Sequence, residues 1–419
     1  MVADLAASIV TTIFLLYVLS YYVLLFLPQR REPRTRRFSS ITIIIPARNE
    51  APYLRACIAS VLAARFKGTK QVIVIDDASI DETACIARSF GRRLMLLRNT
   101  TQLGKAASMN KALKRASGEL IAVVDGDSVI APDALEAAAR EAGKRRVAAV
   151  AAVVKVKNRR QFVNPWVHIE LVYNSLIRAL FSKVNANIVT PGALSVYRAD
   201  ALREIGGFST EGFSEDVDVA IRLIRAGYRV GFAEDAIAET NMPPDPKGFF
   251  RQRMRMARGM INILKRHLEA NKTVIDLYTL PLFLFWYVQA VIMGSITLYQ
   301  LWAGYVTYFA SKGVYVSLGV LKFFFEWFSI VGFVRWTWHV ATGIAPLTFL
   351  AAVGIASTLL SYPLFLYALW KYDGALRPLH LLAFCFMFPF WLLIMVIYIM
   401  SLPELFRTEQ YNRWKKNEP

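Results

Sequence analysis

The sequence predicts an α/β domain of a nucleotide-binding type joined to an α-helical membrane domain. Between residues 40 and 154, short apolar runs alternate with helical stretches, a pattern typical of a parallel sheet with helical crossovers. Long uncharged stretches lie on both sides of this region, and 55% of the 419 residues are hydrophobic. A chain of this composition is too apolar for an ordinary soluble enzyme.

Four stretches are long enough to span a bilayer, which takes about 20 residues without charge. They cover residues 5–28, 277–302, 341–370 and 379–403. The first lacks a basic amino-terminal region, so we interpret it as a retained anchor and not as a cleaved signal peptide. Residues 314–336 are also apolar but contain Lys322, Glu326 and Arg335, which favours either an interfacial helix or a span with a polar stripe. Counting this stretch gives five spans, the number we favour over four.

The chain has a net charge of +19, and many of its basic residues lie next to the apolar stretches. Arginines at positions 30, 31, 34, 36 and 37 follow the first stretch and no basic residue precedes it, so the positive-inside rule places the amino terminus outside. The middle of this multi-pass cell-membrane protein is then cytoplasmic, and five spans return the basic tail to the same side. Membrane lipids and an anionic nucleotide are the expected partners, not nucleic acid. The expected order is an anchor at 1–29, a cytoplasmic domain with interface helices at 38–268, membrane helices at 269–403 and a cytoplasmic tail at 404–419.

The elements of the α/β region are predicted in order from its pattern. Apolar runs predict buried strands at 41–46, 71–75, 94–97, 119–124 and 147–154. Helices are expected between them at 51–64, from 81 onward, at 105–116 and at 132–144. Further along, helical spacing predicts helices at 166–181, 217–226 and 250–259, the first of which either lies along the membrane interface or packs on the sheet.

Two aspartates one residue apart, Asp125 and Asp127, follow the fourth predicted strand. Ligands of open α/β sheets gather at the carboxyl ends of strands, so this pair is expected at the mouth of a crevice. Two such carboxylates can share a hard divalent cation with substrate phosphates, although a simple Asp-Gly-Asp turn is the alternative. The three cysteines and four scattered histidines indicate neither a disulfide framework nor a histidine metal site.

Polar residues also follow the first two predicted strands. Asn49 and Glu50 after the first, and Asp77 and Ser79 after the second, are suited to bind a base or ribose. Each alone would serve equally well as a cap or turn residue, but their shared position at strand ends indicates a site. The pair Gly104-Lys105 before the next helix offers close backbone approach and a cation for phosphate.

The second half of the domain contributes three further candidates. Gly192, in the stretch Thr-Pro-Gly-Ala, allows backbone to approach a substrate closely or simply forms a turn. Glu215 and Asp216 open a predicted helix, where the helix dipole alone would favour acidic residues. Gln252 and Arg255 share one face of a basic helix, for which a membrane-surface helix is the alternative interpretation.

Residues 40–264 resemble the membrane-integrated family 2 glycosyltransferases, the group that contains cellulose, chitin and hyaluronan synthases. In that family, segments similar to residues 46–50 and 76–79 bind the nucleotide, and the Gly-Lys segment matches Gly104-Lys105. The Asp-x-Asp metal motif matches residues 125–127. The Thr-Glu-Asp motif, whose aspartate is the general base, resembles Ser214-Glu215-Asp216, and the Gln-x-x-Arg-Trp motif resembles residues 252–256.

The resemblance implies a GT-A fold, a Rossmann-like α/β domain with a mixed sheet, and inverting transfer of a hexose from a nucleotide-diphosphate sugar. It implies Mg²⁺ or Mn²⁺ at Asp125 and Asp127, and catalysis by Asp216 with Glu215 and Arg255. The implied acceptor contacts are Gly192, Glu215, Asp216 and Met256. The implied contacts of the nucleotide sugar are Pro46, Asn49, Glu50, Asp77, Ser79, Gly104, Lys105, Asp125, Gln252 and Arg255.

One departure from the family pattern bears on the product. Met256 stands where the polymer-forming synthases have a tryptophan, and a flexible thioether does not offer the flat face that suits a sugar ring. We therefore expect a limited, non-processive transfer to a lipid-linked acceptor in the membrane. The chain looks like minimal archaeal members proposed to add mannose to lipid-linked glycans, which makes GDP-mannose the first expectation for the donor. The alternatives are a processive polysaccharide synthase that uses a UDP-sugar, and a non-catalytic nucleotide-sugar-binding protein.

Overall fold

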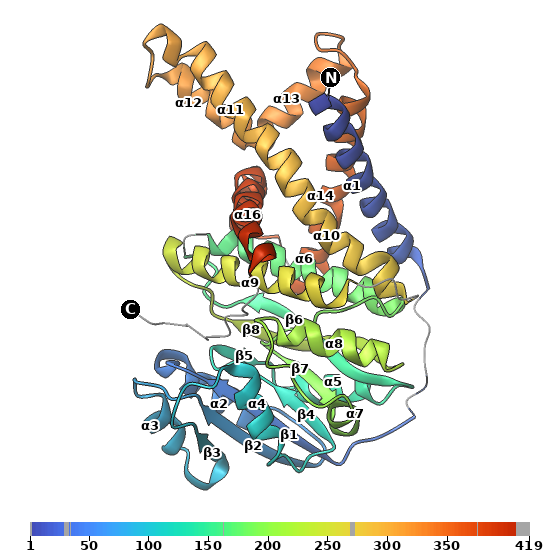
Figure 1. The fold of residues 1–419 in the computed structure, drawn as a ribbon, viewed down its shortest axis with the longest axis vertical. Coiled ribbons are helices and arrows are strands. Elements are labelled where there is room, and N and C mark those ends of the chain that lie inside the picture. Colours follow the sequence, from blue (N-terminus) through green and yellow to red (C-terminus); the bar gives the residue numbers. More distant parts are fainter. Residues whose placement is uncertain are drawn as a thin grey trace.

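The computed structural model describes residues 2–28, 33, 35–161, 163–268, 273–374 and 376–407. Its centre is an eight-stranded mixed sheet in the order β3-β2-β1-β4-β7-β6-β8-β5. Helices cover both faces of the sheet, and a bundle of apolar helices rises from one end of the domain (Figure 1). The strands are β1 Ser40–Ala47, β2 Thr69–Asp76, β3 Met95–Arg98, β4 Leu120–Val123, β5 Ser128–Ile130, β6 Val147–Val156, β7 Ser195–Arg198 and β8 Arg229–Thr240.

Four of the five predicted strands, β1 to β4, pair in parallel, and the fifth, β6, pairs in parallel with β8 and antiparallel with β7. β1 pairs in parallel with both β2 and β4, and β2 pairs in parallel with β3. The prediction missed β5, β7 and β8. β7 runs antiparallel between β4 and β6, and β5 runs antiparallel to β8, so the sheet is mixed and not purely parallel. The expected mixed-sheet fold class is confirmed.

Alternate residues of β1 enter different cores, which explains why its sequence is continuously apolar. Ile43 and Ile45 pack with helices α2 (Ala51–Ala63) and α5 (Ala134–Ala142). Ile44 instead packs with helices on the opposite face, and all three isoleucines are fully buried. A strand that is covered on both sides carries no polar face. The remaining helices of these layers are α3 Thr83–Arg88, α4 Lys105–Leu113, α7 Ala199–Glu204 and α8 Glu215–Arg225.

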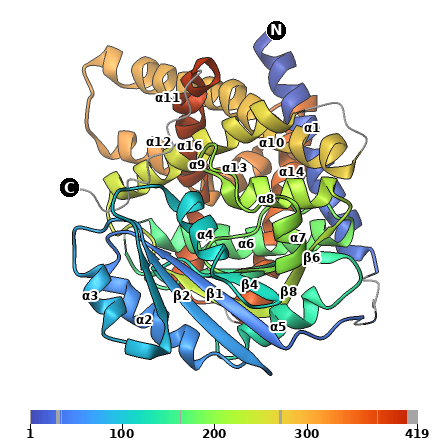
Figure 2. The same ribbon diagram turned by 60° about the horizontal axis from the view of Figure 1, so that its bottom comes forward.

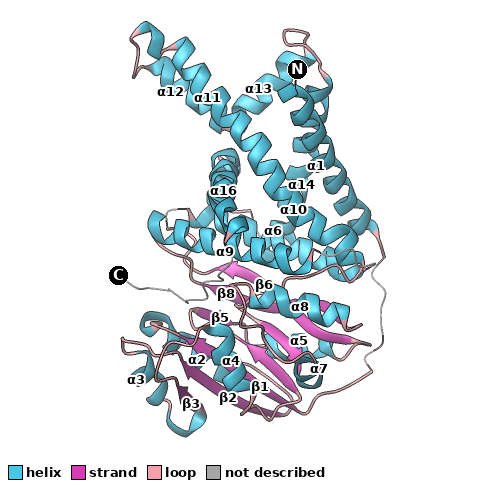
Figure 3. Cartoon of the chain, viewed as in Figure 1, coloured by secondary structure: helices cyan, strands magenta, loops and turns pink. Residues whose placement is uncertain are grey.

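Two helices, α6 (Asn164–Lys183) and α9 (Pro246–His267), lie between the sheet and the apolar helices (Figure 3). α6 packs on β6 on one side and on apolar helices on the other, so residues 166–181 pack on the sheet. Their position along a membrane interface stays a prediction. The apolar helices beyond this layer are α1 Val2–Phe26, η2 Ile275–Thr279, α10 Leu280–Gln289, η3 Ala290–Gly294, α11 Ser295–Tyr308, α12 Leu318–Phe328, α13 Ile330–Ala341, α14 Phe349–Asp373, α15 Pro378–Cys385 and α16 Met387–Ser401.

Four helices in the described part of the chain are long and apolar enough to cross a membrane. The fifth span that we favoured is not formed. Residues 314–336 break at Ser329, whose extended backbone separates α12 from α13. At about 1.5 Å per residue, each of these helices is about 16–18 Å long, well short of the hydrocarbon thickness of about 30 Å. Charged side chains are costly inside the hydrocarbon region, which disfavours a continuous span here. The break between α12 and α13 lets Arg335 pair with Glu326.

The long helices α1, α10–α11 and α14 each meet the domain at one end. Lys183 of α6 donates to the carbonyls of Leu24 and Leu27 at the end of α1, both over 2.9 Å. Arg225 pairs with Asp276 where the second long helix begins, and Lys371 pairs with Glu234 where α14 ends. These contacts fix the three helices relative to the sheet.

The fourth apolar helix, α16, lies differently. Trp166 of α6 donates to the carbonyl of Phe386 before α16, over 2.9 Å, and Arg258 of α9 pairs with Glu404 after it at 2.7 Å. Both ends therefore contact the layer formed by α6 and α9. Figure 1 views α16 nearly end-on, whereas Figure 2 shows it lengthwise across that layer. Although α16 is apolar enough to span, it runs along the domain, and the described end of the chain returns to the domain side.

A buried charge cluster joins α14 to the domain. Arg159 donates to both carboxylate oxygens of Asp373, at 2.9 and 3.0 Å, and His168 and His380 lie 3.4 and 3.8 Å from Asp373 Oδ2. Lys155 lies 3.7 Å away. Within the described ranges, the two histidines and Asp373 are the one cluster with three potential metal ligands, but two cations already neutralise the carboxylate. We interpret the cluster as a structural joint.

Some sequence expectations fall outside the described residues. These include Arg30, Arg31 and Arg34 after the first apolar stretch, and the basic residues of the tail beyond Arg407.

Candidate active site

Asp125 and Asp127 follow the carboxyl end of β4. This strand pairs in parallel with β1 on one side and antiparallel with β7 on the other. The backbone N–H of Asp125 donates to the carbonyl of Gly192 over 2.9 Å, which joins this segment to the turn before β7. Asp127 is buried and its Oδ1 accepts hydrogen bonds from Ser128 and Thr240. Both carboxylates line a cavity of about 1500 Å³ that continues among the apolar helices.

Lys105 joins two acidic residues that are distant in the sequence. Its ammonium group lies 2.9 Å from Asp125 Oδ1 and 2.9 Å from Glu215 Oε1. Lys105 is the first residue of α4 and Glu215 the first of α8, so two helix starts meet at the site. Lys105, Asp125 and Glu215, three candidates from the sequence analysis, therefore lie in direct contact.

Gly192 allows this arrangement because it has no side chain. A Cβ atom at this position would collide with Asp125 Oδ2 and would lie 2.8 Å from the nitrogen of Lys105. The glycine therefore leaves room for this ion pair, and a side chain here would have to displace the end of Asp125 or of Lys105. A role of Gly192 in substrate binding stays a prediction. Its backbone lines the cavity next to the carboxylates.

Asp216 lies in the first turn of α8 and faces the same cavity. Burial raises the pKa of its carboxyl to about 7, and the neighbouring charge of Glu215 adds to this, while Lys105 acts in the opposite direction. Thr190 donates to the carbonyl of Asp216 over 2.6 Å, and Tyr197 donates to the Thr190 hydroxyl over 2.9 Å. A carboxyl group with a pKa near 7 is suited to accept a proton at neutral pH.

Helix α9 brings the third group of candidates to this cavity. Gln252, Arg255 and Met256 all line it, and the Met256 side chain is 52% exposed. α9 closely approaches the residue that precedes α8, because a Cβ at Gly259 would collide with the hydroxyl of Ser214. The structure thus brings together the candidates from residues 105, 125–127, 192, 215–216 and 252–256.

The candidates after β1 and β2 form a separate, neighbouring group that does not line the large cavity. The backbone N–H of Asn49 donates to the Ser79 hydroxyl over 3.0 Å. Asp77 is fully buried and its carboxylate accepts from Asn99 and from the backbone N–H groups of Leu103 and Gly104, over 2.8 to 2.9 Å. Asp77 therefore holds the loop that presents Lys105. Nucleotide contacts by Pro46, Asn49, Glu50, Asp77, Ser79 and Gly104 remain predictions.

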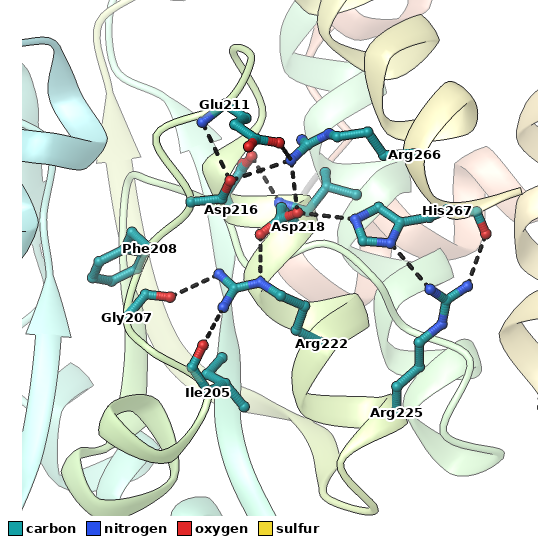
Figure 4. Close-up of polar contacts among 12 residues, drawn as sticks. Ile205, Gly207, Phe208, Glu211, Asp216, Asp218, Arg222, Arg225, Arg266 and His267 are labelled. Atoms are coloured by element: carbon teal, nitrogen blue, oxygen red, sulfur yellow. Dashed lines mark hydrogen bonds and ion pairs between the residues drawn. The ribbon is translucent and has the colours of Figure 1, made fainter.

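The sequence reasoning missed a polar network behind α8 (Figure 4). Asp218 contacts His267 at 2.9 Å, Arg222 at 2.6 Å and Arg266 at 3.1 Å. Arg222 also donates to the carbonyls of residues 205 and 207. Asp218 lies two residues after Asp216 on α8. Its contacts with His267 and Arg266 hold this part of α8 against the end of α9. The spacing of Asp218 and Arg222 by four residues was the sequence signal for part of this network.

The tautomer of His267 follows from its other partner. Arg225 Nη1 lies 3.2 Å from His267 Nδ1, and Arg225 Nη2 donates to the carbonyl of the same histidine over 2.8 Å. A guanidinium has only donors, so Nδ1 must accept and the imidazole is neutral with its proton on Nε2. That proton is donated to Asp218. Arg225 also pairs with Asp276 at 2.9 Å, which extends the network to the start of the second apolar helix.

The carboxylates are a suitable donor set for a divalent cation. Asp125 and Asp127 offer oxygen ligands from one short loop, and both face the cavity. Mg²⁺ and similar ions commonly take one or two protein carboxylates and complete their coordination with substrate phosphates and water. The oxygen ligands of Asp125 and Asp127 fit this pattern, and the ammonium group of Lys105 lies beside them, 2.9 Å from Asp125.

A mixed sheet with a carboxylate pair after its fourth strand and a carboxyl group at a facing helix start defines a GT-A-like domain. Residues 42–206 match the family described as Glycosyl transferase family 2, and this part of the chain is a family 2 glycosyltransferase domain. The resemblance noted from the motifs is confirmed. The matched range ends before Glu215, so the roles of the later candidates are not part of this match.

Curated relatives carry related names. The chain is 28% identical over 242 residues to an N-acetylglucosaminyltransferase of Mesorhizobium japonicum, covering 54% of this chain and 57% of the relative. It is 26% identical over 237 residues to the poly-beta-1,6-N-acetyl-D-glucosamine synthase of Staphylococcus epidermidis, covering 55% and 57%. The chain thus spans a little over half the length of these relatives.

A solved structure resembles nearly the whole chain. It is the mannosyltransferase PcManGT from Pyrobaculum calidifontis in complex with GDP-Man and Mn²⁺, with a TM-score of 0.62 and 20% identity. The match covers 97% of this chain and 99% of that one. At this identity the likeness establishes a shared fold, including the helices beyond the sheet.

Proposed function

We propose that this protein transfers a hexose from a nucleotide-diphosphate sugar to a lipid-linked acceptor in the membrane, with inversion at the anomeric carbon. The observation that carries the proposal is the position of Asp216. Its carboxyl group faces a cavity that contains the Lys105–Asp125 pair at one end and reaches the apolar helices at the other. Donor and acceptor sites of a membrane glycosyltransferase would meet at such a position.

The transfer is a single displacement. Asp216 accepts the proton of the acceptor hydroxyl as its oxygen attacks the anomeric carbon. The bond between that carbon and the diphosphate oxygen breaks, and its electron pair leaves with the nucleoside diphosphate. Lys105 and Arg255 stabilise the charge that develops on the diphosphate. Because no covalent intermediate forms, an α-linked donor gives a β-linked product.

Asp125 and Asp127 would hold the divalent cation, Mg²⁺ or Mn²⁺. When bound, such an ion supplies positive charge at the leaving diphosphate. Lys105, which contacts Asp125 and Glu215, would add a second positive charge beside the ion. The chain's own residues keep the site polar at this end of an otherwise apolar cavity.

The membrane arrangement supports a lipid-linked acceptor. The apolar end of the cavity is lined by aromatic residues of the rising helices, among them Trp286, Trp336 and Tyr362. With α16 lying along the domain, three crossings would place the amino terminus opposite the domain and Arg407. The arginines after α1 favour the cytoplasm for the domain side. The acceptor would enter laterally from the bilayer.

The donor and the extent of transfer have two candidates. GDP-mannose with addition of one residue is the first, supported by Met256 in place of a stacking tryptophan. A UDP-sugar such as UDP-N-acetylglucosamine with processive addition is the second, favoured by the names of the curated relatives. The two differ in both the nucleotide and the product length.

One assay tests the proposal and separates the candidates. Purified protein is incubated with Mn²⁺ or Mg²⁺, a mixture of polyprenyl-linked acceptors and each GDP- or UDP-sugar in turn, and the lipid products are followed by mass. Addition of one hexose from GDP-mannose supports the first candidate. A ladder of products from a UDP-sugar supports the second. No product from any donor, while the nucleotides still bind, would contradict the enzyme assignment.

A further inference from the structure

Arg178 is a buried arginine that the proposed reaction does not use. It lies on α6 between the sheet and the apolar helices, and only 7% of its surface is exposed. Its Nη2 donates to the Ser175 hydroxyl over 2.8 Å and approaches the carbonyl of Ala152 at 3.5 Å. Its Nε has no hydrogen-bond partner. Among the described residues, no carboxylate lies within ion-pair distance of Arg178.

Neighbouring arginines differ from Arg178 in this respect. Arg253, which lines the same cavity, forms two hydrogen bonds with Glu170 at 2.8 and 2.5 Å. Arg258 pairs with Glu404 at 2.7 Å. An isolated buried charge costs several kcal/mol unless an anion compensates it. The other two arginines are compensated within the protein, whereas Arg178 is not.

Arg178 keeps its charge at neutral pH. Burial lowers the pKa of its guanidinium to about 10, and the charge of Asp216 acts in the opposite direction. Asp216 acts on Arg178 only through space, because the two form no ion pair. An anionic group in direct contact with the guanidinium would complete its compensation.

The surroundings of Arg178 indicate where such an anion comes from. One face of α6 lines the cavity at helical spacing, through Glu170, Tyr173, Asn174, Ile177 and Arg178. Tyr173 on this face stacks on Phe365 of α14, with ring centroids 4.0 Å apart. This wall therefore continues from the polar site to the apolar helices. Asn187 lines the same cavity and is 1% exposed. Its side-chain amide nitrogen, Nδ2, has no hydrogen-bond partner.

We propose that Arg178 forms an anion subsite for the acceptor, which binds a phosphate or carboxylate group carried next to the apolar chain of the substrate. The inference rests on the proposed function, because it assigns the group to the acceptor. The donor diphosphate has its own cations at Lys105 and Arg255. A lipid whose chain lies against α14 presents its head group at the level of α6, where Arg178 forms a charge-assisted hydrogen bond with it.

Binding without any donor sugar tests this subsite. The full-length protein is placed in nanodiscs of neutral phosphatidylcholine, and equilibrium binding is measured for farnesyl phosphate and for farnesol. A second pair, dodecyl glucuronide and dodecyl glucoside, separates a carboxylate from a phosphate as the source of charge. We expect the wild-type protein to bind at least one anionic probe about tenfold more tightly than its neutral partner, which corresponds to about 1.4 kcal/mol.

Variants assign that preference to one side chain. Arg178→Gln should abolish the preference, and Arg178→Lys should retain part of it. Arg115→Gln removes an equal charge from an exposed position and should leave the preference unchanged. Nucleotide binding and the thermal midpoint serve as controls for folding.

Each contrary result overturns the subsite. Equal binding of charged and neutral probes by the wild-type protein does so without any variant, and so does a preference that survives Arg178→Gln. If Arg178→Gln does not fold, a preference that Arg178→Lys leaves entirely unchanged also contradicts the proposal. The transfer assay is independent of this result. An anion preference without transfer rejects the proposed function, whereas transfer without the preference rejects only the subsite.

Discussion

The ammonium nitrogen of Lys105 lies 2.9 Å from Glu215 Oε1, which joins the first residue of α4 to the first residue of α8. The same nitrogen lies 2.9 Å from Asp125. One cation therefore holds together the loop of the proposed metal site and the helix that carries Asp216. Removing the charge of Lys105 should therefore affect both the proposed binding of the diphosphate and the pKa of Asp216, the proposed base.

Replacing Lys105 with Met should lower the rate of transfer by at least about 100-fold, because a positive charge that stabilises the leaving diphosphate is lost. The same change should raise the pKa of Asp216 further, since the charge of Lys105 now lowers it. Initial rates across pH would show both effects. The exposed Lys114→Met variant is the control, and a Lys105→Met enzyme with ordinary activity would refute the role.

Replacing Asp216 with Asn should reduce transfer by about 10²–10⁴-fold, because an amide does not accept the proton of the acceptor hydroxyl. Binding of the nucleoside diphosphate should be retained, since the donor cations remain. The comparison requires a transfer rate and an equilibrium binding measurement on the same preparation. Substantial turnover by Asp216→Asn would show that another group is the base.

The pH dependence should follow the ionisation of Asp216. Because its pKa is raised to about 7 and only the ionised form accepts a proton, activity should increase as pH rises through 7. The folded state binds this proton more tightly than the unfolded chain. The group therefore contributes stability at acid pH that is lost as pH rises toward 7. Thermal unfolding at several pH values would reveal this contribution, and Asp216→Asn should remove it.

Replacing Gly192 with Ala should separate Lys105 from Asp125, because the added methyl group occupies the space between them. Overpacking of this kind costs about 1–3 kcal/mol, and we expect both lower stability and weaker donor binding. Gly354→Ala is a matched control, because a Cβ there meets no atom within 4 Å. Equal behaviour of the two variants in unfolding and nucleotide titrations would contradict the close approach.

Replacing His267 with Leu should remove the donor that His267 Nε2 provides to Asp218. The unfolding free energy should fall by about 1–3 kcal/mol, and transfer should also weaken because α8 carries Asp216. His267→Gln keeps a side-chain donor and should recover part of both losses. Thermal unfolding and kcat measured together distinguish this network from a purely local packing effect. No difference between Leu and Gln would argue against the hydrogen bond.

Most of the strands that the sequence pattern predicted are buried. The exception is the edge strand β3, predicted as buried, whose residues are exposed or half-buried. β1, β2 and β4 are continuous apolar runs because helices cover them on either side. β5 and β7 have only three and four residues, and their sequences Ser-Val-Ile and Ser-Val-Tyr-Arg do not stand out as apolar runs. β8 contains Glu234, Asp235 and Glu239, and its charged positions hid the strand. For these reasons the pattern missed β5 and β7, which form only antiparallel pairs, and β8, which is parallel to β6.

The candidate site was partly predictable. Motif spacing identified Lys105, Asp125 and Asp216, and the structure brings them to one end of the cavity. The positions of Arg178 and His267 gave no such signal. An arginine on an amphipathic helix has the same sequence pattern whether its partner is water, a carboxylate or a ligand.

The sequence by itself determined much of the alternation of strands and helices, the apolar helices and the set of candidate site residues, because these depend on local periodicity and residue type. Only the tertiary structure decided that residues 314–336 break into two helices, that α16 runs along the domain, and that Asp373 joins His168 to His380. These features depend on contacts between residues far apart in the chain. Their energies arise only when the elements pack together, so no local pattern records them.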